Sequence, residues 1–75
     1  MEFKGKLMFK NSRGERLFIS KVETTEEAFK KAHEDLKARA PHFKSYYTRS
    51  WINEVGEYWM DVGDHVCFYL VEPNI

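Results

Sequence analysis

The pattern Asn-x-x-Gly-Glu occurs twice in the chain, at residues 11–15 and 53–57. Asn is favoured at the first position of a type I turn, and Gly tolerates the left-handed conformation that closes such a turn with a bulge. Together they are typical of a three-residue hairpin loop, in which the Asn pairs with the residue after the Gly. The sequence therefore predicts two antiparallel hairpins within 75 residues.

The first loop also predicts the register of the strands that flank it. On one side of the hairpin it pairs apolar residues with apolar residues, namely Phe9 with Leu17 and Leu7 with Ile19. On the other side it pairs Lys10 with Arg16, Met8 with Phe18 and Lys6 with Ser20. A four-residue loop would set Phe9 against Arg16, so the bulged register is preferred.

A helix is predicted after the first hairpin. Thr24 and Glu27 form a capping box, in which each side chain can satisfy a free backbone N–H of the other residue. Pro41 ends the helix at about Ala40, because a residue that precedes proline disfavours the helical conformation. One face of the helix is apolar at helical spacing, and it holds Ala28, Phe29, Ala32, His33, Leu36 and Ala40.

Residues 43–72 predict three further strands. The second Asn-x-x-Gly loop joins residues 43–53 to 57–62, and Gly63-Asp64 is a two-residue hairpin signal before residues 65–72. The predicted fold is therefore α+β, an antiparallel sheet of four or five strands with one helix on one face, in the order ββαβββ. In the alternative order, ββαββ, residues 57–62 belong to a loop. Residues 1–75 make a single domain, because a chain this short cannot bury two cores.

Both faces of the predicted sheet are substantially apolar. The second loop pairs Trp51 with Trp59, Arg49 with Asp61 and Ile52 with Tyr58, and the Gly63-Asp64 turn pairs Val62 with His65 and Met60 with Cys67. One face thus collects both tryptophans, and the other collects most of the tyrosines. We expect the Trp-rich face to pack against Phe29 and Leu36, since it holds the larger apolar bulk. The alternative is that the two faces are reversed.

The face that the helix leaves open is the predicted interaction surface. Exposed apolar patches of more than a few hundred Å² usually mark a partner or a second subunit, and Tyr and Met suit contact surfaces. The candidate interaction residues are Tyr46, Ile52, Tyr58, Met60, Tyr69 and Val71.

The formal net charge of zero conceals a gradient along the chain. Residues 1–22 carry six bases and two acids, whereas residues 54–75 carry five acids and no base. Opposite poles can orient a partner during its approach. Alternatively, the basic and acidic segments are neighbours in the fold and compensate each other.

The basic first hairpin supports nucleic-acid binding as an alternative function. Its cationic candidates are Lys4, Lys6, Lys10, Arg13 and Arg16, and four of them share a face with Met8 and Phe18. Bases beside aromatic side chains can bind a phosphate backbone and stack on nucleobases. A pI near 6.8 and the acidic C-terminal third count against this function.

No pattern in the sequence predicts catalysis, a metal or a cofactor. His65 and Cys67 lie two apart on a predicted strand, but a structural zinc site needs four ligands and no further pair has ligand spacing. The four glycines are scattered singly, so no phosphate-binding loop is present. The single Cys and the absence of an apolar leader predict a cytoplasmic protein. The longest apolar run, residues 66–71, is far shorter than the ~20 residues of a membrane span.

The C-terminal run Glu57-Tyr58-Trp59-Met60-Asp61-Val62-Gly63-Asp64-His65, followed by Phe68-Tyr69, resembles small uncharacterised proteins encoded by phages and prophages. It covers about a fifth of the chain, and Asp64 stands where we expect Ser in such relatives. The resemblance implies a small accessory protein that docks on a host protein. It assigns no catalytic or binding residue.

These observations predict a small non-catalytic module that binds a host protein through an open aromatic sheet face, as a phage-type accessory or inhibitory protein would. The alternatives are a nucleic-acid-binding module that uses the basic hairpin, and a homodimeric structural protein.

Overall fold

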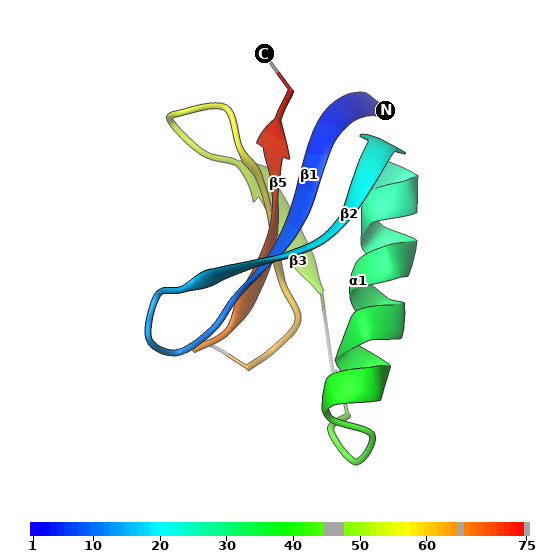
Figure 1. Ribbon diagram of the computed structural model, residues 1–75, viewed down its shortest axis with the longest axis vertical. Coiled ribbons are helices and arrows are strands. Elements are labelled where there is room, and N and C mark those ends of the chain that lie inside the picture. The colour runs from blue at the N-terminus through cyan, green and yellow to red at the C-terminus, as the bar shows by residue number, and fades with distance from the viewer. Residues whose placement is uncertain (45–47, 65, 75) are drawn as a thin grey trace.

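The computed structural model describes residues 1–44, 48–64 and 66–74, and it confirms the α+β fold and the order ββαβββ (Figure 1). The elements are β1 (Glu2–Lys10), β2 (Arg16–Thr24), α1 (Thr25–Arg39), β3 (Arg49–Ile52), β4 (Tyr58–Asp61) and β5 (Phe68–Pro73). All five strands form one antiparallel sheet in the order β2-β1-β5-β4-β3. The alternative order without a separate fourth strand is wrong, because β4 pairs with both β3 and β5. Helix α1 lies along one face of the sheet, against β1 and β2.

Both predicted hairpin loops are confirmed. The backbone N–H of Asn11 donates to the carbonyl of Glu15 at 3.0 Å, and that of Asn53 donates to Glu57 at 2.9 Å. Each Asn side chain also accepts two backbone N–H groups within its own loop. Gly14 and Gly56 have φ values of 83° and 84°, the left-handed conformation that the loop requires.

The first hairpin follows the predicted register only near its loop. Phe9 pairs with Leu17, Met8 with Phe18 and Lys10 with Arg16, as expected. Farther from the loop, Leu7 pairs with Ser20 and Lys6 pairs with Lys21, so the predicted pairs with Ile19 and Ser20 are wrong. The reason is a bulge between Leu7 and Met8, which takes up one additional residue of β2.

The predicted register of β3, β4 and β5 is likewise confirmed near the loop and wrong farther from it. Trp51 pairs with Trp59, Arg49 with Asp61 and Ile52 with Tyr58, as predicted. Met60 pairs with Tyr69 rather than Cys67, because β4 ends at Asp61 and β5 begins only at Phe68. The predicted pair of Val62 with His65 lies outside the described residues. A shift of two residues leaves the paired side chains of β4 and β5 on their predicted faces, because side chains alternate with a period of two.

The predicted N-terminal cap of α1 is confirmed in one of its two hydrogen bonds. The Thr24 hydroxyl accepts the backbone N–H of Glu27 at 3.0 Å, as predicted. The Glu27 carboxylate accepts the backbone N–H of Glu23 at 2.9 Å rather than that of Thr24. The helix ends at Arg39, directly before Ala40 and Pro41.

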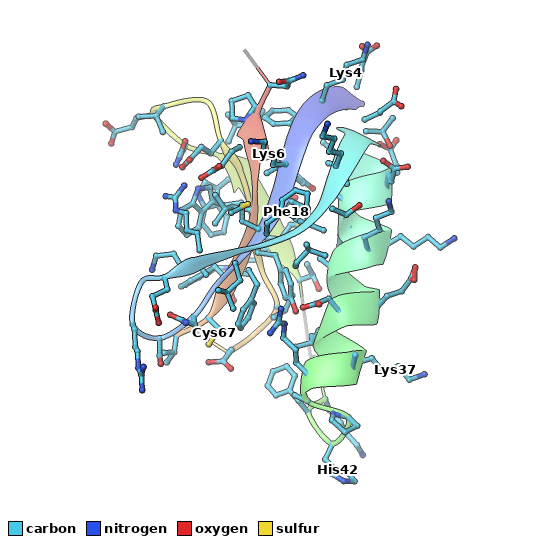
Figure 2. The ribbon with its side chains drawn as sticks, in the orientation of Figure 1. Lys4, Lys6, Phe18, Lys37, His42 and Cys67 are labelled. Atoms are coloured by element: carbon cyan, nitrogen blue, oxygen red, sulfur yellow. The ribbon has the colours of Figure 1, made fainter. Side chains whose placement is uncertain are left out.

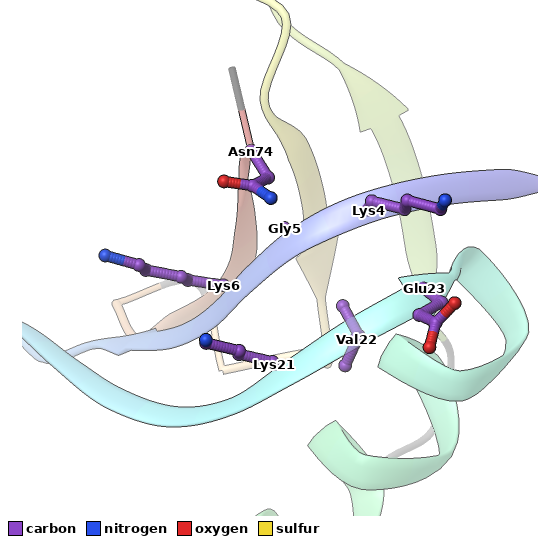
Figure 3. A pocket seen from close by; sticks show the side chains of 7 residues that line it. All are labelled: Lys4, Gly5, Lys6, Lys21, Val22, Glu23 and Asn74. Atoms are coloured by element: carbon purple, nitrogen blue, oxygen red, sulfur yellow. The ribbon is translucent and has the colours of Figure 1, made fainter.

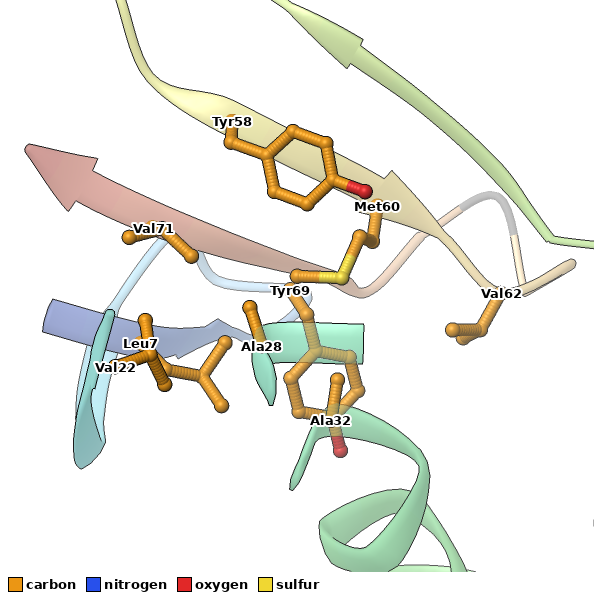
Figure 4. Packing of buried hydrophobic residues seen from close by; sticks show 9 residues of the cluster. All are labelled: Leu7, Val22, Ala28, Ala32, Tyr58, Met60, Val62, Tyr69 and Val71. Atoms are coloured by element: carbon orange, nitrogen blue, oxygen red, sulfur yellow. The ribbon is translucent and has the colours of Figure 1, made fainter. Parts of the chain in front are cut away.

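The core lies between α1 and the face that we expected to be open (Figure 4). The prediction that the Trp-rich face packs against the helix is wrong, and the alternative that the two faces are reversed is confirmed. The buried cluster consists of Leu7, Val22, Ala28, Ala32, Tyr58, Met60, Val62, Tyr69 and Val71. The helix turns Ala28 and Ala32 to the sheet, whereas Phe29 is 41% exposed. These small side chains leave room for the tyrosine and methionine side chains of the sheet.

Hydrogen bonding favours the same arrangement. The Tyr69 side chain is fully buried, and its hydroxyl donates to Asp35 Oδ2 on α1 at 2.7 Å. A buried hydroxyl without a partner costs about 1–3 kcal/mol, and the helix supplies this partner. Asp35 also pairs with Arg39, one turn farther along α1. Apolar bulk alone was therefore an insufficient criterion for the buried face.

Candidate interaction surface

The sheet face opposite α1, called the outer face below, carries an apolar row across all five strands. Phe18 pairs with Met8, Met8 with Leu70, Leu70 with Trp59, and Trp59 with Trp51. Each strand contributes one residue to this row. Leu70, at its centre, is fully buried, whereas Phe18 and Trp51 at its two ends are 56% and 40% exposed.

The aromatic side chains at the β3 end of the row pack against one another. The rings of Trp51 and Trp59 stack with centroids 6.3 Å apart, and Phe68 packs at 5.6 Å from Trp59 in a tilted geometry. The Lys10 ammonium lies 5.9 Å from the ring centroids of both Trp59 and Phe68, within cation–π range. These contacts join β1, β3, β4 and β5 on one surface.

Arg16 extends from β2 and forms a clasp with two carboxylates, that of Glu57 in the loop directly before β4 and that of Glu72 on β5. Its Nη1 atom lies 2.6 Å from Glu57 Oε2 and 2.9 Å from Glu72 Oε2. Its guanidinium carbon lies 5.8 Å from the centroid of the Trp59 ring. The hydrogen bond from Arg16 holds the pKa of Glu57 below its ordinary value. The indole N–H of Trp59 donates to Glu57 Oε1 at 3.1 Å, so the clasp also orients this ring.

A second ion pair, between Arg49 on β3 and Asp61 on β4, lies on the outer face. Arg49 Nη2 lies 3.2 Å from Asp61 Oδ2, and the other oxygen of Asp61 accepts the backbone N–H of Gly63 at 2.8 Å. The predicted cross-strand pair is thus confirmed. Asp61 is buried, so these hydrogen bonds supply the partners that a buried carboxylate requires.

Most of the predicted interaction residues are not on this surface. Tyr58, Met60, Tyr69 and Val71 belong to the core and cannot contact a partner, because α1 covers their face. Ile52 is 51% exposed on the edge strand β3. The sixth candidate, Tyr46, lies outside the described residues.

The cationic candidates occupy different environments. Arg16 is held by Glu57 and Glu72, so the basic and acidic segments compensate each other at this point. Lys4 pairs with Glu2 at 3.5 Å, and Lys10 lies over the aromatic rings. Lys6 lies on β1, and Arg13 is exposed in the hairpin loop.

The sequence prediction missed Trp51, Trp59 and Phe68 as surface residues. Two features of the sequence indicated that the tyrosine face is buried and that the Trp-rich face is therefore exposed. A helix whose apolar face contains Ala28 and Ala32 can approach a sheet closely, and a tyrosine hydroxyl in a core needs a polar partner such as Asp35.

The remaining groups with metal-binding or nucleophilic chemistry are the histidines, the carboxylates and Cys67. Within residues 1–44, 48–64 and 66–74, no three His, Cys, Asp or Glu side chains are grouped to hold a metal ion. Cys67 is half-buried, and burial raises the pKa of its thiol. His65 lies outside the described residues, so the geometry of the His65–Cys67 pair does too. Among the described helical residues, no segment has the length and hydropathy needed to cross a bilayer.

Comparisons of the chain with protein-family models, with curated proteins and with solved structures give no match.

Proposed function

We propose that this protein is a non-catalytic binding module that docks on a partner protein through its outer face. The observation that carries the proposal is the exposure of two large aromatic side chains, Phe18 and Trp51, at opposite ends of one apolar row. Leu70 is buried between them, so Phe18 and Trp51 would act as two separate aromatic anchors for a partner. Trp, Phe and Met are enriched in interfaces, and Trp often contributes much of the binding energy.

Side chains on the outer face are also ordered by contacts with one another in the unbound protein. Glu57 accepts hydrogen bonds from both Arg16 and Trp59, and Trp59 stacks against Trp51. Side chains that are already ordered lose less conformational entropy on binding. The ion pairs beside the row supply the polar rim that typically surrounds an interface core.

The resemblance of residues 57–65 to phage proteins supports the same function. This run includes β4, which contributes Trp59 to the apolar row. We therefore favour a host protein as the partner, as expected of a phage-type accessory or inhibitory protein in the cytoplasm.

The test is a comparison of two variants in affinity capture. The tagged chain is incubated with nuclease-treated lysate of the source or host organism, and bound proteins are identified by mass spectrometry. We expect Phe18→Ala combined with Trp51→Ala to lose the partner. Phe29→Ala removes an exposed aromatic side chain from α1 and should retain it. Equal recovery with the outer-face variant and the wild type would refute the proposed surface.

Single-stranded nucleic acid is the second candidate ligand, and one specific observation favours it. Lys10 lies over Trp59 and Phe68 on the outer face, which combines a cation with aromatic rings. Proteins that bind single strands stack bases on aromatic side chains and neutralise phosphates with nearby cations. Among the residues that the structure describes, three of the cationic candidates form no ion pair, namely Lys6, Lys10 and Arg13.

Salt dependence separates the two candidates. Three phosphate contacts to a single strand would give a log–log slope of affinity against salt of about −2. Fluorescence anisotropy with a labelled oligothymidylate between about 50 and 200 mM salt measures this slope. Binding with that slope, lost in Lys10→Gln, would favour nucleic acid. The absence of binding at the lower salt concentration would exclude it.

A further inference from the structure

A pocket of about 370 Å³ lies where β1 and β2 approach the C-terminal residues (Figure 3). Three lysines line it, Lys4, Lys6 and Lys21, together with Glu23 and Asn74. The backbone N–H of Asn74 donates to the carbonyl of Lys4 at 2.9 Å, which fixes the C-terminal segment beside β1. The volume is at the lower end of the range for small-molecule sites, about 300–1,000 Å³.

Two of the lysines face each other directly. Lys6 and Lys21 are cross-strand partners in the β1–β2 ladder. Their side chains extend from the two strands in the same direction, while Glu23 and Lys4 lie at the other end of the pocket (Figure 3). Like charges in directly opposed positions destabilise an antiparallel pair.

The bulge between Leu7 and Met8 creates this arrangement. Without it, Lys6 would oppose Ser20, as the loop geometry alone predicts. Within the described part of the chain, neither Lys6 nor Lys21 forms an ion pair with an acidic side chain. Lys6 also stands opposite Glu72 in the β1–β5 ladder, but the Glu72 carboxylate is bound by Arg16 at 2.9 Å. The fold therefore places two lysines opposite each other on the lining of one pocket, without an ion pair to either among the described residues.

We propose that this pocket binds a small phosphate-bearing anion between the ammonium groups of Lys6 and Lys21. Lys is a strong point-charge ligand for phosphate, and two opposed ammonium groups match a multiply charged anion. Binding would replace the repulsion between the lysines with two attractive contacts. The pocket is separate from the apolar row, so this inference does not rest on the proposed docking function.

The test is a titration of the ¹⁵N-labelled protein with sodium tripolyphosphate at constant ionic strength, with sodium chloride as the reference. We expect saturable shifts of the backbone amide signals of Gly5, Lys6, Lys21 and Val22. Lys21→Gln should weaken binding roughly tenfold or more, the effect of removing one charged hydrogen bond. Lys37→Gln is the matched control, because it makes the same charge change on the end of α1 remote from Lys4 and Lys6 (Figure 2).

Thermal unfolding supplies a second, independent measurement. In dilute anion-free buffer, Lys21→Gln should melt at or above the wild-type temperature, because it removes the repulsion with Lys6. Tripolyphosphate should raise the melting temperature of the wild type and of Lys37→Gln, but much less that of Lys21→Gln. Equal increases in all three proteins would overturn the site, since they would reflect a general salt effect.

The same titration distinguishes a free anion from a nucleic-acid backbone. If a short oligothymidylate displaced tripolyphosphate at lower concentration than inorganic phosphate did, the pocket would belong to a nucleic-acid surface, and the small-anion proposal would be wrong. Displacement by inorganic phosphate, with no competition from the oligonucleotide, would support the proposal.

Discussion

Substitution of Tyr69 tests directly which face of the sheet is buried against α1. Tyr69 is fully buried between α1 and the sheet, and its ring packs 5.2 Å from Phe9. Truncating a buried aromatic side chain to Ala costs about 3–5 kcal/mol. A 75-residue domain has a total stability of roughly 4–11 kcal/mol, so Tyr69→Ala removes a large part of it. At about 4–8 °C per kcal/mol, the melting temperature should fall by at least ~12 °C.

A second variant at the same position isolates the hydroxyl. Tyr69→Phe keeps the ring but removes the hydrogen bond to Asp35, and it should cost about 1–2 kcal/mol. Thermal unfolding followed by circular dichroism measures both variants. If Tyr69→Ala melted within 2–3 °C of the wild type (about 0.5 kcal/mol), Tyr69 would be a surface residue, and the assignment of the two faces would be wrong.

The Tyr69 hydroxyl also predicts an alkaline limit to stability. Burial, followed by the hydrogen bond to Asp35, raises the pKa of Tyr69 above its ordinary value of 10. A group whose pKa is raised on folding contributes stability that is fully present below the unfolded-state pKa and is lost as the pH rises beyond it. The free energy of unfolding should therefore fall above about pH 10, and Tyr69→Phe should show a smaller fall. An equal decline in both proteins would assign the effect to other groups.

Two further substitutions test other parts of the fold. A Cβ on Gly5 would lie 2.1 Å from the backbone carbonyl oxygen of Glu72, so Gly5→Ala should force β1 and β5 apart and cost about 3 kcal/mol or more in chemical denaturation. A Gly5→Ala variant as stable as the wild type would contradict the close approach of these strands. Arg16→Gln breaks the clasp and should cost about 1 kcal/mol at pH 7, since the pair is only partly screened from solvent. Because the pKa of Glu57 is lowered on folding, this difference should begin to fall below about pH 4.5, the ordinary pKa of Glu, and be lost as the pH falls through the folded-state pKa. A difference that stayed constant throughout an acid titration from about pH 4.5 downward would refute the electrostatic account.

Local patterns in the sequence were sufficient to predict the helix, the strands and their order along the chain. The two Asn-x-x-Gly-Glu loops specify their own hydrogen bonds through side chains within five residues, and the Thr24 cap and Pro41 mark the limits of α1 in the same way. The pairs nearest each loop follow from its geometry. These features depend on neighbouring residues alone, so one sequence is enough to predict them.

The features that were predicted incorrectly depend on contacts between distant segments. The bulge beside Leu7 changes the partner of Lys6, but no residue type at that point requires it. The choice of buried face depends on Asp35 meeting Tyr69, thirty-four positions away. Because both faces are apolar, the hydrophobic pattern could not decide between them, and the candidate surface was therefore assigned to the wrong side.

The modest size of the domain has an energetic consequence for the proposed partner binding. A chain of this size buries only about 60% of its unfolded surface, so its stability is modest and any ligand that binds only the folded state raises it appreciably. A partner present at a hundred times its dissociation constant adds about 2.7 kcal/mol, which corresponds to roughly 11–22 °C in melting temperature.

This stabilisation should depend on Trp51 and not on Phe29. Both are aromatic side chains of similar exposure, 40% and 41%, but only Trp51 belongs to the outer face. A purified partner should therefore raise the melting temperature of Phe29→Ala by as much as that of the wild type, and that of Trp51→Ala much less. If the two variants responded equally, the apolar row would not be the docking surface, even where binding itself was tight.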